Sequence, residues 1–185
     1  MRVLKILATA SAAALLALGL ALPASAAETA KAPLKDKSGK DVGTVELTQT
    51  QAGVLLKLAV KGLPAGEHAF HIHAVGKCEP PFASAGPHFN PTNHKHGMLS
   101  GEGHAGDMPN LHVPQDGALE VEVLNAAITL DKGKPNSVFQ SAGTAVVVHG
   151  GKDDYKSDPA GNAGDRIACG VIVEGPATTG AGPAR

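Results

Sequence analysis

Apolar and polar residues alternate along most of the chain beyond its N-terminal region. The alternation is clearest in residues 44–48, 54–61 and 119–123, where Val or Leu takes every second position. A period of two places apolar side chains on one face of a β-strand and polar ones on the other. Turn-forming dipeptides such as Ser38-Gly39 and Asp116-Gly117 separate the segments. The sequence therefore predicts an all-β fold, an antiparallel barrel or sandwich.

Three further apolar runs are predicted strands that carry chemically active side chains. They are residues 67–75 with His71 and His73, residues 144–148 leading into His149, and residues 167–173, which follow Arg166 and contain Cys169. Because alternate residues of a strand share a face, the imidazoles of His71 and His73 are expected to point the same way. Residues 27–34 are rich in Ala and Lys with little pattern, which predicts a loose start to the mature chain.

Residues 1–26 have the composition of a secretory signal peptide. A basic start precedes the largely apolar run 6–22, which ends in Pro23 and the small residues Ala24-Ser25-Ala26. The alternative is a membrane-spanning helix. Such a helix needs about 20 apolar residues and does not end in a cleavage site of small residues. We therefore expect cleavage after Ala26 and a mature chain without membrane association.

Cleavage changes the charge balance and defines the domain. Two basic residues are lost, so the 16 Lys and Arg of the sequence fall to 14, against 17 Asp and Glu. With this mildly acidic balance and only five aromatic residues, one Tyr and four Phe, no nucleic-acid partner is expected. Residues 27–174 are long enough for one domain with a real core. Residues 175–185, rich in small residues, Pro and Gly, are predicted to be a disordered tail.

Cys78 and Cys169 are the only cysteines of the chain. In an exported protein a disulfide is the default assignment for such a pair. Two thiolate metal ligands are the alternative, weakened by the absence of a C-x-x-C spacing.

Histidine is concentrated in one stretch. Residues 69–107 hold six of the nine histidines of the chain, and most of the stretch, residues 76–106, has no strand pattern. A loop of this length in a compact domain is usually functional or disordered. His71 and His73 could chelate one ion, and His88, His96, His104 and Asp107 could form a closed tetrahedral zinc site of three nitrogens and one oxygen. The stretch therefore predicts metal binding.

These residues lie in motifs that resemble copper, zinc superoxide dismutase, of the bacterial secreted branch. The similarity runs in order from about Leu34 to Val173. Its blocks are FHIH at 70–73, SAGPHFNP at 84–91, KHG at 95–97, the H-x-G-D of 104–107, VVVHGGKDD at 146–154 and GNAGDRIACGV at 161–171. The resemblance implies an eight-stranded antiparallel Greek-key barrel with long metal-binding loops.

The resemblance also implies the ligands of one copper and one zinc ion per subunit. The copper ligands would be His71, His73, His88 and His149. The zinc ligands would be His88, His96, His104 and Asp107, so that His88 bridges both metals. Arg166 would be the guanidinium beside copper, Asp153 a carboxylate joining His71 to His96, and Cys78 the disulfide partner of Cys169. His68, His94 and His112 match no ligand position and are expected to be non-ligand polar residues.

The implied reaction is the conversion of two superoxide anions and protons to dioxygen and hydrogen peroxide, with copper cycling between Cu(II) and Cu(I). Arg166 and His88 would be the catalytic residues. The expected location is the bacterial periplasm, and the expected assembly is a homodimer, with a monomer as the alternative. A non-enzymatic copper or zinc binding protein on the same fold is the alternative function. A zinc hydrolase is a weaker one, because no general base is evident.

One departure from the family concerns charge. The segment 155–160 is shorter than the charged loop of the animal cytosolic enzymes and lacks their Glu-Glu and Lys arrangement. Lys152 and Lys156 are candidates for a substitute field that attracts superoxide, as a hypothesis.

Overall fold

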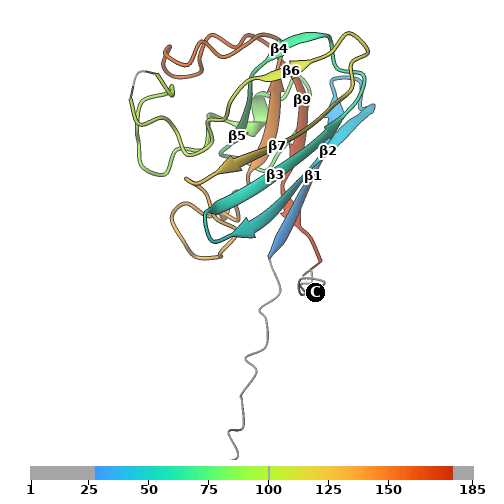
Figure 1. Cartoon of the computed structure of the whole chain (residues 1–185). Coiled ribbons are helices and arrows are strands. Elements are labelled where there is room, and N and C mark those ends of the chain that lie inside the picture. The colour runs from blue at the N-terminus through green and yellow to red at the C-terminus, as the bar shows by residue number, and fades with distance from the viewer. Residues whose placement is uncertain (1–27, 100, 177–185) are drawn as a thin grey trace, which may run out of the picture.

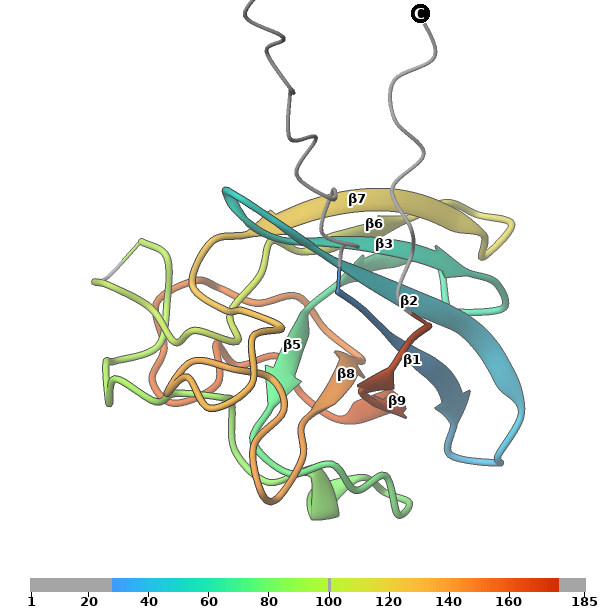
Figure 2. The same cartoon turned by 90° about the horizontal axis from the view of Figure 1, so that it is seen from below.

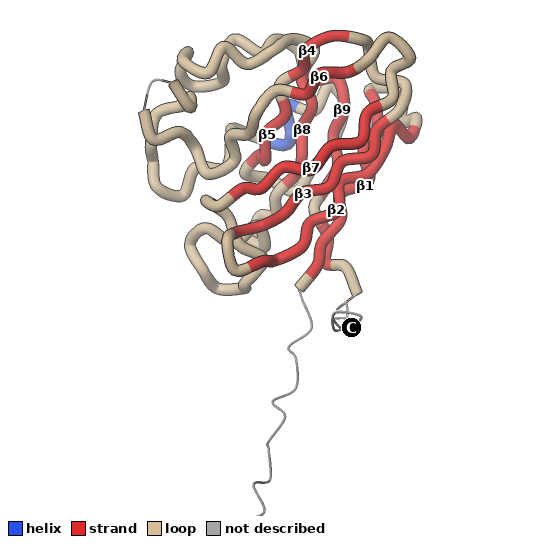
Figure 3. Tube along the Cα trace, in the orientation of Figure 1, coloured by secondary structure: helices blue, strands red, loops and turns tan. Residues whose placement is uncertain are grey.

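The computed structural model describes residues 28–99 and 101–176, so the predicted signal peptide lies outside the described residues. The described part contains ten strands and one short 3-10 helix, and strands dominate it (Figures 1 and 3). The strands are β1 Thr29–Asp36, β2 Asp41–Thr50, β3 Gly53–Val60, β4 Gly66–His68, β5 Phe70–His73, β6 Leu111–Val113, β7 Leu119–Asn125, β8 Ala145–His149, β9 Arg166–Val171 and β10 Val173–Glu174. The helix is η1 Ala83–Ala85. None of the helices in these residues is long and apolar enough to cross a membrane.

Eight strands form one antiparallel sheet, in the order β5-β8-β9-β1-β2-β3-β7 with β10 added beside β1. Figure 2 shows how this sheet curls into a half-barrel, and β4 and β6 form a separate two-stranded pair. The pairings of β9 with β1 and of β7 with β3 join strands that are distant in sequence, as in a Greek key. The predicted antiparallel all-β barrel or sandwich is confirmed.

The concave face of the sheet holds the core. Leu47, Leu56 and Leu58 from the predicted alternating segments are fully buried there. The opposite face is charged: Lys31, Glu46, Lys57 and Glu122 are register neighbours across β1, β2, β3 and β7, so opposite charges alternate across the sheet. Such cross-strand pairs are favourable, and they leave one face for solvent and one for packing.

The expectation of a loose start at residues 27–34 is wrong. Strand β1 covers most of this segment, and its inward residues Ala30, Ala32 and Leu34 are almost fully buried. Alanine is a weak sign of a strand, because its small side chain contributes little to the packing that defines β-propensity. Pairing with β2 on one side and with β9 and β10 on the other makes β1 a central strand.

Two predicted strands are each split by one residue. Ala69 separates β4 from β5; its N–H donates to the carbonyl of Gly151 and its own carbonyl accepts from the N–H of His149. Ile172 separates β9 from β10 and donates to the carbonyl of Thr144. The first break lets β4 pair with β6 while β5 pairs with β8, and it ties β5 to His149.

The long loop has no strand in its described residues, as predicted, and its one helix is η1. In Figures 1 and 3 this loop lies beside the loop that connects β8 to β9, at one side of the sheet. The two loops are joined where the N–H of Leu99 donates to the carbonyl of Tyr155 at 3.1 Å. At the other end of the chain, Gly175 and Pro176, the start of the predicted tail, are hydrogen bonded to Thr29.

Candidate metal centre

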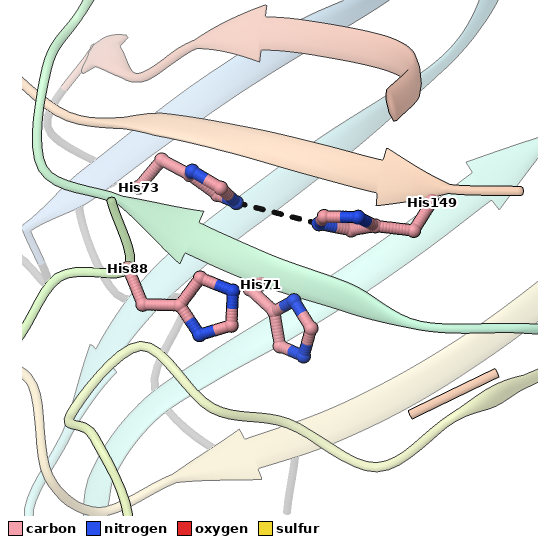
Figure 4. A group of neighbouring side chains, drawn as sticks. All are labelled: His71, His73, His88 and His149. Atoms are coloured by element: carbon pink, nitrogen blue, oxygen red, sulfur yellow. Dashed lines mark hydrogen bonds between the residues drawn. The ribbon is translucent and has the colours of Figure 1, made fainter. Parts of the chain in front are cut away.

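Four histidines converge where β5 and β8 meet the long loop. His71 and His73 lie on β5, opposite Val147 and Ala145 of β8, and His149 ends β8. An isolated bridge with His73 brings in His88 from the loop. One ligand atom of each histidine lies within 4.8 Å of the others, and Figure 4 shows the four rings facing one another. Two rigid paired strands and one loop therefore build a group of four imidazoles.

A second group shares His88. It consists of His88, His96, His104 and Asp107, whose ligand atoms also lie within 4.8 Å of one another. The Asp107 carboxylate lies 2.9 Å from His88 Nδ1, 3.0 Å from His96 Nδ1 and 3.5 Å from His104 Nδ1. These three nitrogens surround one carboxylate. All four side chains are buried or nearly so.

Gly106 brings the two groups together. Its N–H donates to the carbonyl of Phe89, and its own carbonyl accepts from the N–H of Ile72. A Cβ atom on Gly106 would lie 2.3 Å from the carbonyl oxygen of Ile72, so only glycine allows this approach. The contact sets Asp107 beside β5, where it forms an isolated bridge with His71.

Asp153 contacts one histidine of each group and so joins the two groups. Its carboxylate oxygens lie 2.8 Å from His71 Nε2 and 3.0 Å from His96 Nε2. Burial alone would raise its pKa, but the hydrogen bonds with His71 and His96 outweigh burial and lower the pKa to about 2. Asn110 holds the backbone of Asp153 by two hydrogen bonds, of 2.8 and 2.9 Å. Asp153 therefore fixes which ring nitrogens of His71 and His96 remain for a metal.

Arg166 lies at the edge of the four-histidine group. It begins β9, and its guanidinium donates to the carbonyls of Phe82 and Gly86, both at 2.7 Å. The Gly86 carbonyl also lies 2.9 Å from His73 Nδ1, which links Arg166 to His73. Arg166 and His149 together line a surface pocket of about 220 Å³, so the group can be reached from solvent at this point.

The disulfide between Cys78 and Cys169 is formed, which confirms the pairing and leaves no free thiol. Cys169 lies on β9, three residues beyond Arg166, and Cys78 lies just before the segment that supplies the Phe82 and Gly86 carbonyls. The crosslink therefore holds that segment against the strand that carries Arg166.

The chemistry of the donors fits metal ions. His71 Nδ1 and His88 Nε2 are buried and have no hydrogen-bond partner among the described residues. Burial, together with neighbouring histidines, lowers the pKa of His73 to about 2 and that of His149 to about 3. Burial also lowers the pKa of His88 to about 4, although Asp107 opposes it. Neutral imidazole is the form that binds copper and zinc, so these three rings are ready for metal at neutral pH.

The comparisons with known proteins agree with this geometry. The family model of copper/zinc superoxide dismutase matches residues 42–172. A copper-zinc superoxide dismutase of Aquifex aeolicus is 58% identical over 144 residues, which is 76% of this chain and 85% of that protein. The chain belongs to the copper/zinc superoxide dismutase family.

Solved structures of the superoxide dismutase family share the fold. A SOD-like protein from Bacillus subtilis matches with a TM-score of 0.74 and 37% identity, over 77% of this chain and 97% of that chain. Copper/zinc superoxide dismutase from Brucella abortus matches with a TM-score of 0.66 and 30% identity, over 79% of this chain and 100% of that chain. The comparisons support the oxidoreductase, not the non-enzymatic alternative, and the metals of the family are copper and zinc.

The remaining histidines lie outside both groups. His94 pairs with Glu102 at 2.9 Å, and the exposed His112 lies 3.6 Å from Glu67. His68 is buried, with Nδ1 2.9 Å from the His149 carbonyl and Nε2 2.8 Å from the Pro64 carbonyl. Its contact with the backbone of His149 has no sequence signal, because it arises from the break at Ala69.

The two lysines that are candidates for a substitute field do not line the pockets that contain Arg166. Lys152 pairs with Glu67 at 3.3 Å. Neither Lys152 nor Lys156 is among the residues that line the two pockets containing Arg166.

Proposed function

We propose that the chain is an exported superoxide dismutase, with copper held by His71, His73, His88 and His149 and zinc held by His88, His96, His104 and Asp107. The observation that carries this assignment is the position of His88. Its Nδ1 lies 2.9 Å from Asp107 in one group, while its Nε2 is buried without a hydrogen-bond partner among the described residues. A single ring can therefore serve both metals, which is the feature that separates this centre from a simple zinc site.

The reaction converts two superoxide anions and two protons into dioxygen and hydrogen peroxide. Copper supplies a one-electron acceptor and donor when bound, and zinc, which has no redox chemistry, holds the loop residues in place. His88 can carry one of the required protons at Nε2 while its Nδ1 side remains with the zinc group. Superoxide is a small anion, so a cation at the copper group is needed to attract and orient it.

Arg166 meets that need. Two of its N–H groups are already used by the Phe82 and Gly86 carbonyls, which fixes the direction of the guanidinium. A guanidinium has five N–H donors, so others remain for an anion. Its partial burial lowers its pKa, but an arginine stays charged throughout the physiological range. A fixed cation beside His149 can therefore bind superoxide in one orientation.

We also propose export to the bacterial periplasm, with cleavage after Ala26. The proposal rests on the composition of residues 1–26 and on the bacterial relatives. The disulfide agrees with an oxidising compartment. The homodimer remains our proposal for the assembly, with a monomer as the alternative.

The function is tested on protein purified after export, whose N-terminus is expected at Ala27. Metal analysis should find one copper and one zinc per chain, and the protein should disproportionate superoxide. Removal of copper alone should abolish the activity, and its return should restore it. Fully loaded protein without activity would instead support a binding or delivery protein, and protein that holds zinc but no copper would support the zinc hydrolase.

A second test concerns Asp153, whose carboxylate contacts His71 of one group and His96 of the other. Asn cannot accept hydrogen bonds from both His71 and His96, because only one of its two terminal atoms is an acceptor. Changing a residue that orients metal ligands typically costs about 10–100-fold in metal affinity or activity. Asp153→Asn is therefore expected to weaken zinc binding by about that factor, measured by competition with a chelator. Asp116→Asn, at an exposed turn, is the control, and equal affinities in the two variants would contradict the role of Asp153.

A further inference from the structure

Two surface pockets meet at Arg166. The smaller one, about 220 Å³, reaches His149, and the larger one, about 590 Å³, is lined by Lys37 and Asp165 among others. Both pockets include Gly164 and Arg166, so they are two parts of one approach to the guanidinium. Asp158 is a further charged residue in the smaller part. Of the lysines, only Lys37 is among the residues that line these two pockets.

The fold brings Lys37 to this position from far along the chain. Lys37 lies in the turn between β1 and β2, and the end of β1 pairs with β9 through Lys35 opposite Cys169 and Asp36 opposite Ala168. This pairing places the turn beside the Arg166 end of β9. Lys37 Nζ lies 3.2 Å from a carboxylate oxygen of Asp165, the residue before Arg166.

The turn that carries Lys37 is well held. The Asp36 carboxylate accepts from the Ser38 N–H at 2.8 Å, from the Ser38 hydroxyl at 2.6 Å and from the Lys40 N–H at 3.0 Å. The hydrogen bond with the Ser38 side chain is the main cause of a lowered pKa at Asp36, so this carboxylate is ionised when it accepts them. Lys37 therefore presents its charge from a defined turn.

We propose that Lys37 and Asp165 set the rate at which superoxide reaches Arg166, with Lys37 attracting the anion and Asp165 repelling it. This inference rests on the proposed dismutase function. Charges at the rim of a binding site act mainly on association rate and its salt dependence. They act over about 8 Å at physiological ionic strength, a range that suits residues lining the same pocket as Arg166. Lys37 is thus a further candidate for the role considered for Lys152 and Lys156, and it is the one of the three that lines a pocket with Arg166.

The competing explanation is that the ion pair only fastens the β1–β2 turn to β9. The two explanations predict different signs for the change in kcat/KM of the two variants. If the pair is a fastener, Lys37→Gln and Asp165→Asn break the same contact and change the rate in the same direction. If the two charges act on superoxide, Lys37→Gln lowers kcat/KM and Asp165→Asn raises it.

The experiment uses fully copper- and zinc-loaded protein. At low ionic strength we expect kcat/KM for superoxide to fall about twofold in Lys37→Gln and to rise about twofold in Asp165→Asn, and both differences should vanish near 1 M salt, where the Debye length is about 3 Å. Azide, a small anion with no part in the turnover, should bind the loaded protein more weakly in the first variant and more tightly in the second, as measured by absorption titration.

The ion pair of Lys35 with Asp41 is a matched control. It lies at the same β1–β2 hairpin with an N–O distance of 2.7 Å, and neither residue lines the two pockets. Lys35→Gln and Asp41→Asn should leave kcat/KM and azide affinity close to wild type. Changes of equal sign in the two Lys37–Asp165 variants, or effects that survive high salt, would overturn the inference. An inactive but fully loaded wild-type protein would overturn the proposed function instead.

Discussion

Replacing His149 with alanine is expected to remove copper from the protein and to abolish superoxide disproportionation, while zinc stays bound. His149 belongs to the four-histidine group alone, whereas the group proposed to hold zinc has no residue from β8. Changing a residue that merely supports a ligand typically costs about 10–100-fold, so loss of the ligand itself should cost more than about 100-fold in activity. Metal analysis and the activity assay on the same preparation measure both effects.

The control for this variant is His112→Ala, which removes an exposed histidine outside both groups. It should keep both metals and full activity. Since His149 is buried, its replacement also leaves a cavity, so the melting temperature of the metal-free variant must be recorded. A folded His149→Ala protein that retains activity would disprove the copper assignment, and simultaneous loss of copper and zinc would mean that the two groups are not separable in the way we propose.

The strands that could be predicted are those whose buried side chains are large. In β2, β3 and β7, Leu or Val takes every second position over several residues, and the pattern alone identifies these strands. In β1 the inward positions include Ala30 and Ala32, so the alternation is nearly invisible although both are buried. The breaks at Ala69 and Ile172 are also hidden, because their hydrogen bonds go to residues distant in sequence.

The candidate site also has a part that the sequence predicts and a part that it does not. The number and spacing of the histidines and Asp107 predict metal binding, and the resemblance divides these residues into two groups. The resemblance also gives Asp153 as the carboxylate that joins His71 to His96. The contacts that hold Asp153 and Arg166 in place have no sequence signal. Asn110 acts on the backbone of Asp153, and Arg166 is held by two carbonyls that any residue could supply. Backbone contacts depend on the fold and not on the residue type, so they leave no signal in one sequence.

The charged residues around Arg166 are also hard to predict from the sequence. Lys152 and Lys156 are candidates because segment 155–160 is shorter than the charged loop of the animal cytosolic enzymes and lacks its charge arrangement. Lys152 is instead paired with Glu67. Lys37 is distant in sequence but reaches the pocket through the pairing of β1 with β9. Because the small side chains of Ala30 and Ala32 hide the strand pattern of β1, the position of Lys37 just after β1 has no sequence signal either.

Removing the disulfide is the second change with a large expected effect. The two cysteines are 91 residues apart, and a crosslink that closes a loop of this length is expected to stabilise the fold by about 4 to 5 kcal/mol in the chain-entropy model. Cys78→Ser combined with Cys169→Ser should therefore lower the melting temperature of the metal-free protein by roughly 8–20 °C, at about 2–4 °C per kcal/mol for a chain of this size. Metal-free protein is used because bound metal adds its own stabilisation.

The same change should also reach the site, because the segment between Cys78 and His88 supplies the Phe82 and Gly86 carbonyls that hold Arg166. Once that segment is no longer tied to β9, Arg166 loses its fixed direction. The metal-loaded double variant is therefore expected to keep copper and zinc but to have a lower kcat/KM. Reduced wild-type protein shows whether the loss of the crosslink or the substitutions themselves cause the effect. It should have the same melting temperature as the double variant. If reduced protein melted like oxidised protein instead, the stability would come from the packing of Cys169 against β8, and the loss of activity would need another cause.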